Sequence, residues 1–531
     1  MSAVAAPGAP DRRLFRFIAF GLVVVLATSV LTVRLFYLQI VQGGKYDAIA
    51  DRNRSVIVAI PATRGLIYDR TGRPLVTNVP SFAVKIRPAD LSLAERPEVA
   101  ARLSALLGIP EAEINAAIDA NPGSRFDLVR IATGVPEATA RLISESGLDL
   151  PGVEVAVESR RDYADGPLMS QILGYTGPIN VDELEALRDA GYLPDDVLGK
   201  TGVESVYEAA LRGTYGLEKV ERDATGRKIG VLEQVRSAVP GASLRLTIDT
   251  TEQAYAQKAL LWGIKEAKLK RGVVIVMNPQ TGEVLALVSL PTYDNNLFAR
   301  GISNADFERL IRDGNKPLLN HATGAQYPPG STYKLVTGTG GLADRKITPS
   351  TELLTRPFLA IGKTRFYEWN RRGWGECDLD CGFGHSSDTF FFQVAGMLGI
   401  DRLAYWANQF GFGERTGIDL PGEAKGIVPS NDWKLSTFGQ SIFPGEVYQA
   451  GIGQGYDVVT PIQLVNAYAA LANGGKLYQP QVVREVVGPD GAVIRPFAPK
   501  LIRKLDVPQS VLREMRQAAR NVVLIRHTYN L

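Results

Sequence analysis

Hydrophobic and polar positions are distributed unevenly along this chain, and the longest apolar run comes first. From Phe17 to Val33 no side chain is charged. As a helix, this run would span about 26 Å at 1.5 Å per residue, close to the roughly 30 Å hydrocarbon core of a bilayer. We therefore predict a transmembrane helix over residues 17–40. A helix buried in a protein core is the alternative, and it fits poorly because three arginines flank the run on one side.

The residues around the apolar run predict its processing and its orientation. Arg12, Arg13 and Arg16 precede it on a very short tail, and Arg34 follows it where a cleavage site would need small residues. The run is also longer than the apolar core of an ordinary signal peptide. We expect an uncleaved anchor with a cytoplasmic tail over residues 1–16, because positive charges stay on the cytoplasmic side. Everything after about residue 40 would then lie across the membrane.

Beyond the anchor, short apolar segments separated by turn signals predict strands, and helix-spaced apolar residues follow them. The predicted strands cover Val56–Ile60, Gly65–Tyr68, Pro74–Thr77, Phe82–Ile86 and Val153–Glu158. The predicted helices, which we expect to form a small helix-rich insertion, cover Leu93–Leu107, Glu111–Ala120 and Glu137–Ser146. We assign residues 45–240 to an elongated α/β module next to the membrane, with a hinge at Pro240-Gly241.

The pattern after this hinge indicates a second module. A strand over Leu244–Ile248 leads into a helix that Asp249 caps and that runs to Leu269. Strands over Val273–Asn278 and Glu283–Ser289 flank a Pro-Gln-Thr-Gly turn and predict a β-hairpin. The predicted fold class of residues 241–531 is therefore α+β, an antiparallel sheet with helices packed on it.

Length, composition and charge exclude several classes of protein. The 531 residues are enough for more than one hydrophobic core. Lys+Arg 59 against Asp+Glu 56 leaves a net charge of +3, so we expect no nucleic-acid partner. Hydrophobic residues at 45% exclude wholesale disorder, and two cysteines cannot form a disulfide framework. The three histidines include no His-Glu-x-x-His pair, which argues against a zinc hydrolase, and we expect no cofactor.

The first candidate for chemistry is Tyr327-Pro-Pro-Gly-Ser331-Thr-Tyr-Lys334, which a helix-compatible run follows. Ser331 and Lys334 are three residues apart, so on a helix they share one face. A desolvated lysine amine can lose its proton and activate a serine hydroxyl, and a helix N-terminus favours a developing oxyanion. Because Ser-x-x-Lys also occurs by chance, a surface helix cap is the alternative interpretation.

A second serine and a carboxylate follow in Ser386-Ser387-Asp388, ahead of an apolar helix. Ser386 and Asp388 have the chemistry to relay a proton between a nucleophile, a lysine and a leaving amine. The alternative is an ordinary N-cap, in which a serine or aspartate satisfies the free N–H groups of the helix. Taken alone, these three residues favour the cap.

Together these motifs resemble the penicillin-binding transpeptidases, whose active site combines Ser-x-x-Lys, Ser-x-Asn and a later Lys-Thr-Gly strand. Further segments that look like family motifs are Arg64–Gly72, Gly199–Gly213, Pro279–Ala286, Pro291–Asp294 and Gly453–Gly455. Ser-Ser-Asp in place of Ser-x-Asn is similar to the class B branch called penicillin-binding protein 2, which builds lateral cell wall. The likeness covers nearly the whole chain.

The resemblance implies an architecture. It implies a single-pass protein of the inner membrane, with a pedestal of the dimerisation-domain type over residues 45–240. An extracytoplasmic transpeptidase domain, related in fold to serine β-lactamases, would occupy residues 241–531. The implied partners are a RodA-like glycosyltransferase of the SEDS type and other proteins of the elongation complex.

The resemblance also implies a reaction, the D,D-transpeptidation that cross-links peptidoglycan stem peptides. By this likeness Ser331 attacks the penultimate D-Ala carbonyl, and Lys334 is its base. Ser386 would pass protons, and Asp388 would orient Lys334 and Ser386. Penicillins and other β-lactams would acylate Ser331 by mimicking the substrate.

One family motif has no counterpart after the nucleophile in this sequence. The family would place Lys-Thr-Gly some tens of residues after Val507–Val523, whereas Lys200-Thr201-Gly202 precedes Ser331 and belongs to the pedestal pattern. In the family that strand supplies one oxyanion N–H, whose loss typically costs about 10²- to 10³-fold. We therefore expect an incomplete transpeptidase domain in a truncated, impaired product, or else a non-enzymatic scaffold that binds the glycosyltransferase.

Two cysteines and a histidine need a separate interpretation. Cys377, Cys381 and His385 follow one another at four-residue spacing. Three such ligands can hold zinc. The fourth ligand would come from Glu376, Asp378 or Asp380. A local disulfide or two free thiols are the alternatives, and we favour these over a metal site.

Overall fold

The computed structural model describes residues 12–45, 55–120, 125–126, 128–147, 149–222 and 228–529. The chain divides into two units, which are described one after the other. The first comprises Met1–Pro61 and Tyr215–Ala238, and the second comprises Ala62–Thr214 and Val239–Leu531.

In the first unit, the apolar run forms α1 (Arg12–Phe36), which continues as a short π-helix, η1 (Tyr37–Val41). Within the described ranges, Phe15–Val41 is the one helical stretch long and apolar enough to cross a membrane. Its large apolar side chains are exposed, so the alternative of a helix buried in a core is wrong. The described residues therefore contain a single membrane anchor, as the sequence predicts.

The same unit contains a three-stranded antiparallel sheet. Its strands are β1 (Ser55–Ile60), β8 (Gly216–Arg222) and β9 (Lys228–Arg236), with β8 in the centre. The predicted strand Val56–Ile60 is confirmed by β1. β1 pairs with β8, which comes more than 150 residues later in the chain, and a local pattern cannot reveal this pairing.

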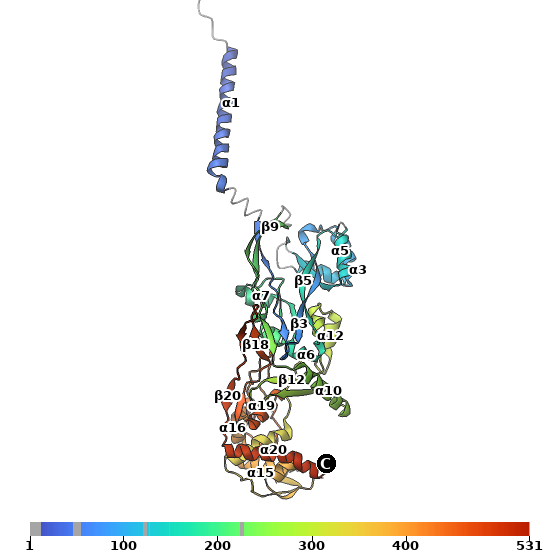
Figure 1. Cartoon of the computed structure of the whole chain (residues 1–531), viewed down its shortest axis with the longest axis vertical. Helices are drawn as coiled ribbons and strands as arrows, with labels where there is room; N and C mark the ends of the chain where they lie inside the picture. The colour runs from blue at the N-terminus through green and yellow to red at the C-terminus, as the bar shows by residue number, and fades with distance from the viewer. Residues whose placement is uncertain are drawn as a thin grey trace, which may run out of the picture. The chain divides into compact units, whose positions relative to one another are not determined.

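The second unit is organised around a seven-stranded sheet (Figure 1). Its strands are β2 (Ile67–Tyr68), β3 (Pro74–Ile86), β4 (Val129–Val135), β5 (Val153–Tyr163), β10 (Ser243–Leu246), β18 (Val483–Val487) and β19 (Val493–Arg495). The order is β19-β18-β10-β2-β3-β4, and β5 pairs with β3. β10 runs parallel to β2 and antiparallel to β18, so strands from both sides of the predicted hinge share one sheet.

Part of this sheet differs from the sequence prediction. The prediction of separate strands at Pro74–Thr77 and Phe82–Ile86 is wrong, because both belong to the single strand β3. β5 pairs with β3 without interruption from Val76 to Ile86, which holds the polar stretch between them in extended form. Backbone pairing therefore overrides the local turn signal at this point.

The predicted helix-rich insertion contains its three helices and one unpredicted strand. The helices are α3 (Arg96–Leu107), α4 (Glu111–Asp119) and α5 (Glu137–Glu145). They pack their buried apolar residues together with those of β3 and β4. β4 was missed because polar residues and Gly134 interrupt its alternation.

Short elements connect this sheet to the rest of the pedestal. They are η2 (Pro88–Asp90), α6 (Gly166–Leu173), β6 (Thr176–Pro178), α7 (Val181–Leu187), η3 (Arg188–Ala190), β7 (Val197–Gly199), α8 (Gly202–Val206) and α9 (Glu208–Leu211). A buried ion-pair cluster joins α8 to the segment before β2. Glu204, which is 0% exposed, accepts hydrogen bonds from Arg64 Nε and Arg161 Nε, both at 2.8 Å.

The arginines decide the charge state of this cluster. Burial would raise the pKa of Glu204, but the charges of Arg161 and Arg64 hold it below its ordinary value. Arg64 also bonds Glu208, and Arg161 donates to the carbonyl oxygen of Gly65 at 2.8 Å. The cluster therefore stays fully ionised. It joins the two pedestal motifs, Arg64–Gly72 and Gly199–Gly213.

The helix and hairpin predicted for the second module, residues 241–531, are confirmed. The helix is α10 (Thr250–Glu266), and Asp249 caps it by accepting from the N–H groups of Thr251 and Glu252. The hairpin strands β11 (Gly272–Met277) and β12 (Val284–Leu290) pair antiparallel, and α10 packs on them. The α+β class predicted for this part is confirmed.

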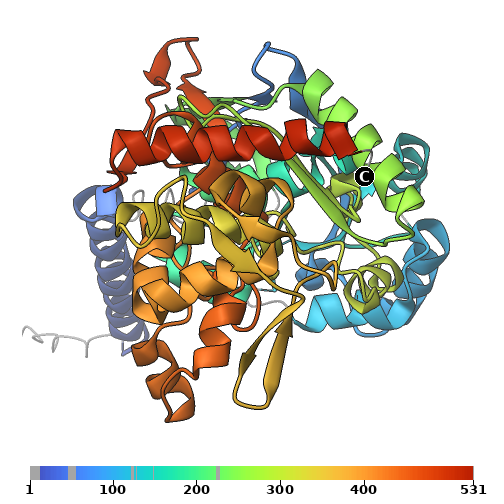
Figure 2. The same cartoon turned by 90° about the horizontal axis from the view of Figure 1, so that it is seen from below.

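The remaining elements form a helical layer with short hairpins. They are α11 (Asn295–Ala299), α12 (Asn304–Arg312), η4 (Gly330–Tyr333), α13 (Lys334–Ala343), β13 (Leu353–Thr355), β14 (Phe358–Ile361), β15 (Thr364–Tyr367), β16 (Gly375–Cys377), α14 (Leu379–Gly384), α15 (Asp388–Leu398), α16 (Ile400–Gln409), α17 (Asn431–Phe438), α18 (Pro444–Gly451), α19 (Pro461–Ala472), β17 (Lys476–Tyr478), β20 (Leu501–Lys504) and α20 (Gln509–Tyr529). α13 lies against α15, and α20 lies across α13 and α14, as the red helix of Figure 2 shows. Their buried side chains form one core, which includes Val336, Phe390, Phe391 and Met515.

Candidate active site

Ser331 and Lys334 lie at the start of the central helix. Ser331 is in the 3₁₀ turn η4, and Lys334 is the first residue of α13. Because residues three apart eclipse one another in a 3₁₀ turn, the expected shared face is present. Ser331 is exposed, whereas Lys334 is 1% exposed. The helix begins where the sequence predicted, with a tighter first turn.

The loop after α18 packs directly against this serine turn. The N–H of Gly330 donates to the carbonyl oxygen of Gly453 at 2.9 Å. A Cβ atom on Gly453 would lie 2.5 Å from the carbonyl oxygen of Gly330 and from the Cβ of Tyr333, and φ is +69° there. Only glycine allows this approach. The Gly-Gln-Gly segment therefore supports the turn that presents Ser331.

The ammonium group of Lys334 is the centre of a polar cluster. Its Nζ donates to the carbonyl oxygen of Ser386 at 2.7 Å, to Ser386 Oγ at 3.1 Å and to Asp388 Oδ1 at 2.8 Å. These three acceptors use all three donors of the ammonium group. The structure thus brings together Lys334, Ser386 and Asp388. Ser331 lies one turn away, and in the described part of the chain its hydroxyl makes no hydrogen bond to Lys334.

The connection between α14 and α15 explains how Ser386 and Ser387 differ. α14 ends in a Schellman motif, since Ser386 N–H donates to Phe383 O at 3.0 Å and Ser387 N–H donates to Gly382 O at 2.9 Å. Ser386 occupies the left-handed position of this motif with φ +53°, where a non-glycine residue costs about 1–2 kcal/mol. That conformation directs its carbonyl oxygen to Lys334.

Ser387 caps the next helix, because its side chain accepts from the N–H of Phe390. The cap interpretation is therefore right for Ser387. Ser386 and Asp388, on either side of this cap residue, both contact Lys334.

Burial shifts both charged partners toward their neutral forms. It lowers the pKa of Lys334, and the charge of Asp388 opposes the shift. It raises the pKa of Asp388, against the charge of Lys334. Since both shifts reduce the cost of a neutral Lys334, the amine can release its proton at a lower pH than a lysine in water.

Sequence reasoning missed a buried carboxylate, Glu368, which lies between β15 and β16 and is 0% exposed. Its Oε2 accepts from Ser387 Oγ at 2.7 Å, from Thr389 N–H at 2.9 Å and from Thr389 Oγ1 at 2.7 Å. Its Oε1 accepts from Asp388 N–H at 3.0 Å and from Trp369 N–H at 3.2 Å. The one available signal was that Glu368 is the sole acid in an aromatic, arginine-rich stretch.

The two cysteines form a disulfide between β16 and the first turns of α14. The zinc interpretation of Cys377, Cys381 and His385 is therefore wrong, because paired sulfurs are not thiolate ligands. Asp378, offered as a fourth ligand, caps α14 by accepting from Cys381 N–H at 2.9 Å. The His385 ring stacks on Trp374 at 4.0 Å. No cluster of three potential ligands occurs in the described residues.

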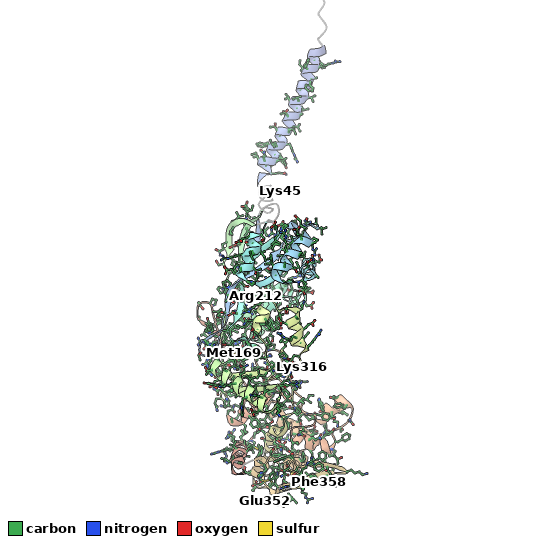
Figure 3. The ribbon with its side chains drawn as sticks, turned by 90° about the vertical axis from the view of Figure 1, so that its right-hand side faces the viewer. Lys45, Met169, Arg212, Lys316, Glu352 and Phe358 are labelled. Atoms are coloured by element: carbon green, nitrogen blue, oxygen red, sulfur yellow. A yellow bond between two sulfur atoms is a disulfide. The ribbon has the colours of Figure 1, made fainter. Side chains whose placement is uncertain are left out.

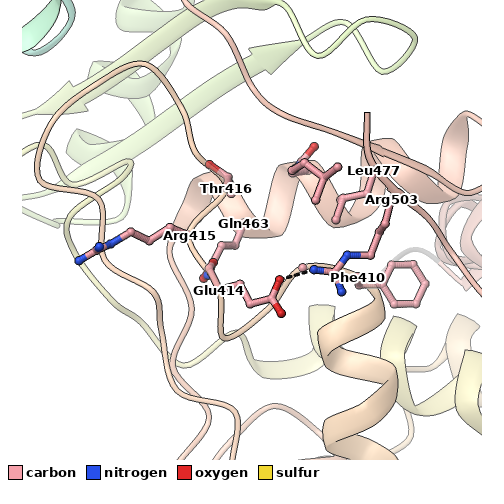
Figure 4. A pocket seen from close by; sticks show the side chains of 10 residues that line it. Phe410, Glu414, Arg415, Thr416, Gln463, Leu477 and Arg503 are labelled. Carbon is pink, nitrogen blue, oxygen red and sulfur yellow. Dashed lines mark hydrogen bonds and ion pairs between the residues drawn. The ribbon is translucent and has the colours of Figure 1, made fainter. Parts of the chain in front are cut away.

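A small pocket lies elsewhere, near the end of α16 and the side of α19 (Figure 4). Glu414 pairs with Arg503 at its rim, and Gln463 donates to the carbonyl oxygens of Glu414 and Lys425. Its lining contains none of the residues that the sequence proposed for chemistry. The cluster around Lys334 therefore remains the candidate active site.

Comparisons with known proteins give the family of this chain. The penicillin-binding protein transpeptidase domain matches residues 272–527, and the penicillin-binding protein dimerisation domain matches residues 59–246. The peptidoglycan D,D-transpeptidase MrdA of Haemophilus influenzae is 36% identical over 501 residues, covering 93% of this chain and 75% of that protein. The chain belongs to the MrdA-type penicillin-binding protein 2 family. The resemblance inferred from the motifs is confirmed.

Solved structures of penicillin-binding protein 2 have the same fold as this MrdA-type chain. The Helicobacter pylori protein, in its complex with MreC, matches with a TM-score of 0.76 at 28% identity, over 89% of this chain and 84% of that chain. A peptidoglycan synthase complex, described as coordinating polymerization and crosslinking, matches with a TM-score of 0.65 at 29% identity, over 95% and 84%. The predicted boundary between the two modules, at residues 240 and 241, lies inside the segment that matches the dimerisation domain.

Proposed function

We propose that this MrdA-type chain is a peptidoglycan D,D-transpeptidase that acts through an acyl-enzyme on Ser331. The observation that carries the proposal is a buried lysine, bonded to Ser386 and Asp388, one turn from an exposed serine. A relative of the same family bears that activity in its name. The substrates are the stem peptides of peptidoglycan, and no cofactor takes part.

The acylation step assigns one role to each residue. Neutral Lys334 takes the proton of the Ser331 hydroxyl while Oγ attacks the penultimate D-Ala carbonyl carbon. The terminal D-Ala leaves as an amine, which receives that proton through Ser386. Asp388 orients Lys334 and Ser386 and stabilises the ammonium form in between.

Deacylation repeats these proton transfers in the reverse direction. The amine of an acceptor stem peptide attacks the acyl carbon, and its proton passes to the Lys334 amine. Lys334 then returns a proton to Ser331 Oγ as the ester bond breaks. A new peptide bond forms, and Ser331 and Lys334 regain their starting states.

Penicillins and other β-lactams would acylate the same serine, which gives a direct test. Fluorescent penicillin is added to membranes that contain the full chain, beside a Ser331→Ala control. We expect a labelled band that disappears in the control. Absence of labelling from the folded chain, or labelling that survives Ser331→Ala, would contradict the proposal.

We place the chain in the inner membrane with residues after about 40 outside the cytoplasm. The support is that α1 is exposed along its length and that Arg16 lies near its N-terminal end. Protease added to spheroplasts is expected to digest the part after α1 while a cytoplasmic marker stays intact. Full protection of the chain would contradict this topology.

We also propose a RodA-like SEDS glycosyltransferase and other elongation-complex proteins as partners. The similarity to a synthase complex and to a protein captured with MreC supports this choice. The full chain is expected to co-purify with the glycosyltransferase from mild detergent. A version with α1 replaced by an unrelated membrane helix serves as the comparison, and absence of the glycosyltransferase from the intact chain would contradict the pairing.

A further inference from the structure

The segment between η4 and α14 contains a positively charged surface. We call residues 356–375 the cationic arm; it includes the β14–β15 hairpin, gold in Figure 2, and Phe358, labelled in Figure 3. Five exposed cations lie on it, namely Arg356, Lys363, Arg365, Arg371 and Arg372. None of them has an ion pair within the described residues. The single acid of the arm, Glu368, is fully buried.

Exposed aromatic rings accompany these charges. Tyr367 is 43% exposed and Trp369 is 53% exposed. The guanidinium of Arg371 lies 4.2 Å from the centre of the Tyr367 ring, and that of Arg365 lies 4.5 Å from the Phe358 ring. Stacking fixes these cations at the surface without neutralising them.

The arm is joined to the candidate active site at its base. Trp369 Nε1 donates to the carbonyl oxygen of His385 at 3.0 Å, and Trp374 stacks on the His385 ring. His385 directly precedes Ser386, which binds Lys334. The base of the arm is therefore joined to the segment that presents Ser386 to Lys334.

We propose that the cationic arm binds free carboxylates of a peptidoglycan strand, beyond the peptide that reacts. This inference rests on the proposed function and adds a second, electrostatic contact to the same substrate. Unpaired cations on one side of a site attract an anionic chain and increase its rate of encounter by about tenfold or more.

The test uses the full chain and purified insoluble peptidoglycan in a sedimentation assay over a range of salt concentrations. The triple variant Arg365→Gln, Arg371→Gln, Arg372→Gln is expected to bind about tenfold more weakly and to lose most of its salt dependence. Peptidoglycan with amidated carboxylates should abolish the difference between variant and parent. The control variant, Arg309→Gln with Arg312→Gln, removes exposed arginines of α12 that already pair with Asp306 and Glu308.

Equal binding and equal salt dependence of the triple variant and the parent would overturn the arm's role. Penicillin labelling of Ser331 is measured on the same samples and is expected to stay within about twofold, because a small β-lactam does not extend along the arm. Loss of labelling in the parent itself would instead contradict the proposed function. The two failures are thus distinguishable.

The buried carboxylate of Glu368 supports a second inference. It holds the N–H groups of Asp388 and Thr389 and the hydroxyls of Ser387 and Thr389. These groups form the first turn of α15 and its cap. We infer that Glu368 is a positioning residue, which fixes Asp388 and the preceding Ser386 against Lys334.

An amide cannot replace this carboxylate. Both oxygens of Glu368 accept from backbone N–H groups, whereas Glu368→Gln would direct an NH₂ group at one of them. The same change removes a negative charge. The charged groups facing Lys334 are Asp388 and Glu368, and both favour its protonated form.

The sign of the expected pH effect follows from these charges. Loss of the Glu368 charge lowers the pKa of Lys334, so the acid limb of the pH–rate profile for acylation should move to lower pH in Glu368→Gln. The acylation rate at the pH optimum should fall about tenfold. Glu368→Asp retains the charge and should leave the limb in place. Merely structural damage would reduce the rate at every pH without moving the limb.

Two further variants keep the test decisive if Glu368→Gln folds poorly. Thr389→Val removes one donor to Glu368 and keeps the charge, so a smaller rate loss with an unmoved limb is expected. Glu423→Gln is the matched control, because Glu423 likewise accepts from a threonine N–H and hydroxyl, those of Thr416. Parental rates and pH profiles in both Glu368→Gln and Thr389→Val would overturn the role.

Discussion

Two buried ion-pair clusters in this chain contain similar groups and have different charge states. In the pedestal, Glu204 binds Arg64 and Arg161, and its pKa is lowered despite burial. In the active site, Asp388 binds Lys334, and burial raises the pKa of this carboxyl. Two guanidinium groups overcome the cost of burying one carboxylate, whereas one ammonium does not.

The difference separates a structural cluster from a chemical one. An arginine keeps its proton under all ordinary conditions, so the pedestal cluster can only hold the chain together. A lysine can lose its proton, and burial lowers the pKa of Lys334. A lysine–aspartate pair is therefore suited to proton transfer, and a carboxylate that two arginines hold is suited to stability.

The largest expected effect tests the chemical cluster. Lys334→Ala removes the base, so penicillin acylation should fall by about 10³-fold or more. The control is Lys200→Ala in the pedestal Lys-Thr-Gly, where Lys200 pairs with Glu183. Acylation by Lys334→Ala at a rate near that of the parent would remove Lys334 from the mechanism.

The next effect tests the structural cluster. Glu204→Gln leaves the buried Arg161 without its carboxylate and removes one of the two carboxylates that bind Arg64, so it should lower the free energy of unfolding by about 3–5 kcal/mol. Denaturant titration measures this loss, with the exposed Glu185→Gln as the control. The acylation rate per folded molecule should not change, and a large fall in that rate would show that the clusters are coupled.

The same variant has a pH signature. Because the folded pKa of Glu204 is lowered, its stabilisation is present above the ordinary glutamate pKa of 4.5 and is lost as pH falls through the lower folded value. Glu204→Gln should therefore show a flatter dependence of stability on pH in that acid range.

A smaller effect separates the hydroxyl of Ser386 from its backbone strain. Ser386→Ala and Ser386→Gly both remove the proton relay and should each slow acylation by about 10²-fold. Glycine accepts φ +53° without cost, so Ser386→Gly should be more stable than Ser386→Ala by about 1 kcal/mol. Thermal unfolding measures the difference, and equal stability would mean that the strain is relieved elsewhere.

The smallest effect is a shift along the pH axis. Asp388→Asn keeps an acceptor for Lys334 but removes the negative charge that favours the ammonium form. The pKa of Lys334 should fall, so the acid limb of acylation moves to lower pH by about one unit. A limb that moves to higher pH would show that a different group controls the rate.

Local sequence signals predicted the groups that lie close together in the chain. Ser331 and Lys334 share one turn, and Ser386 and Asp388 flank a cap, so turn and cap chemistry made them candidates. The family resemblance then favoured chemistry over a plain helix cap. The left-handed conformation of Ser386 was not predictable, because a Lys334 contact 52 residues away supports it.

Long-range contacts account for what the sequence did not reveal. Glu368 binds the first turn of α15 from another segment, and its neighbours in sequence do not show which helix it contacts. β3 was divided in two because its pairing with β5, rather than its own pattern, keeps the middle extended. In both cases the deciding partner is remote in sequence.

The central position of β10 limits how this protein can be cut into fragments. β10 lies between β2 and β18, so it closes the sheet across the predicted hinge at Pro240-Gly241. A fragment that ends at residue 240 would leave β2 with an open edge and the buried Ile67 uncovered. Such a fragment is prone to aggregate, and a soluble pedestal fragment should extend past Leu246 and carry a substitute for β18.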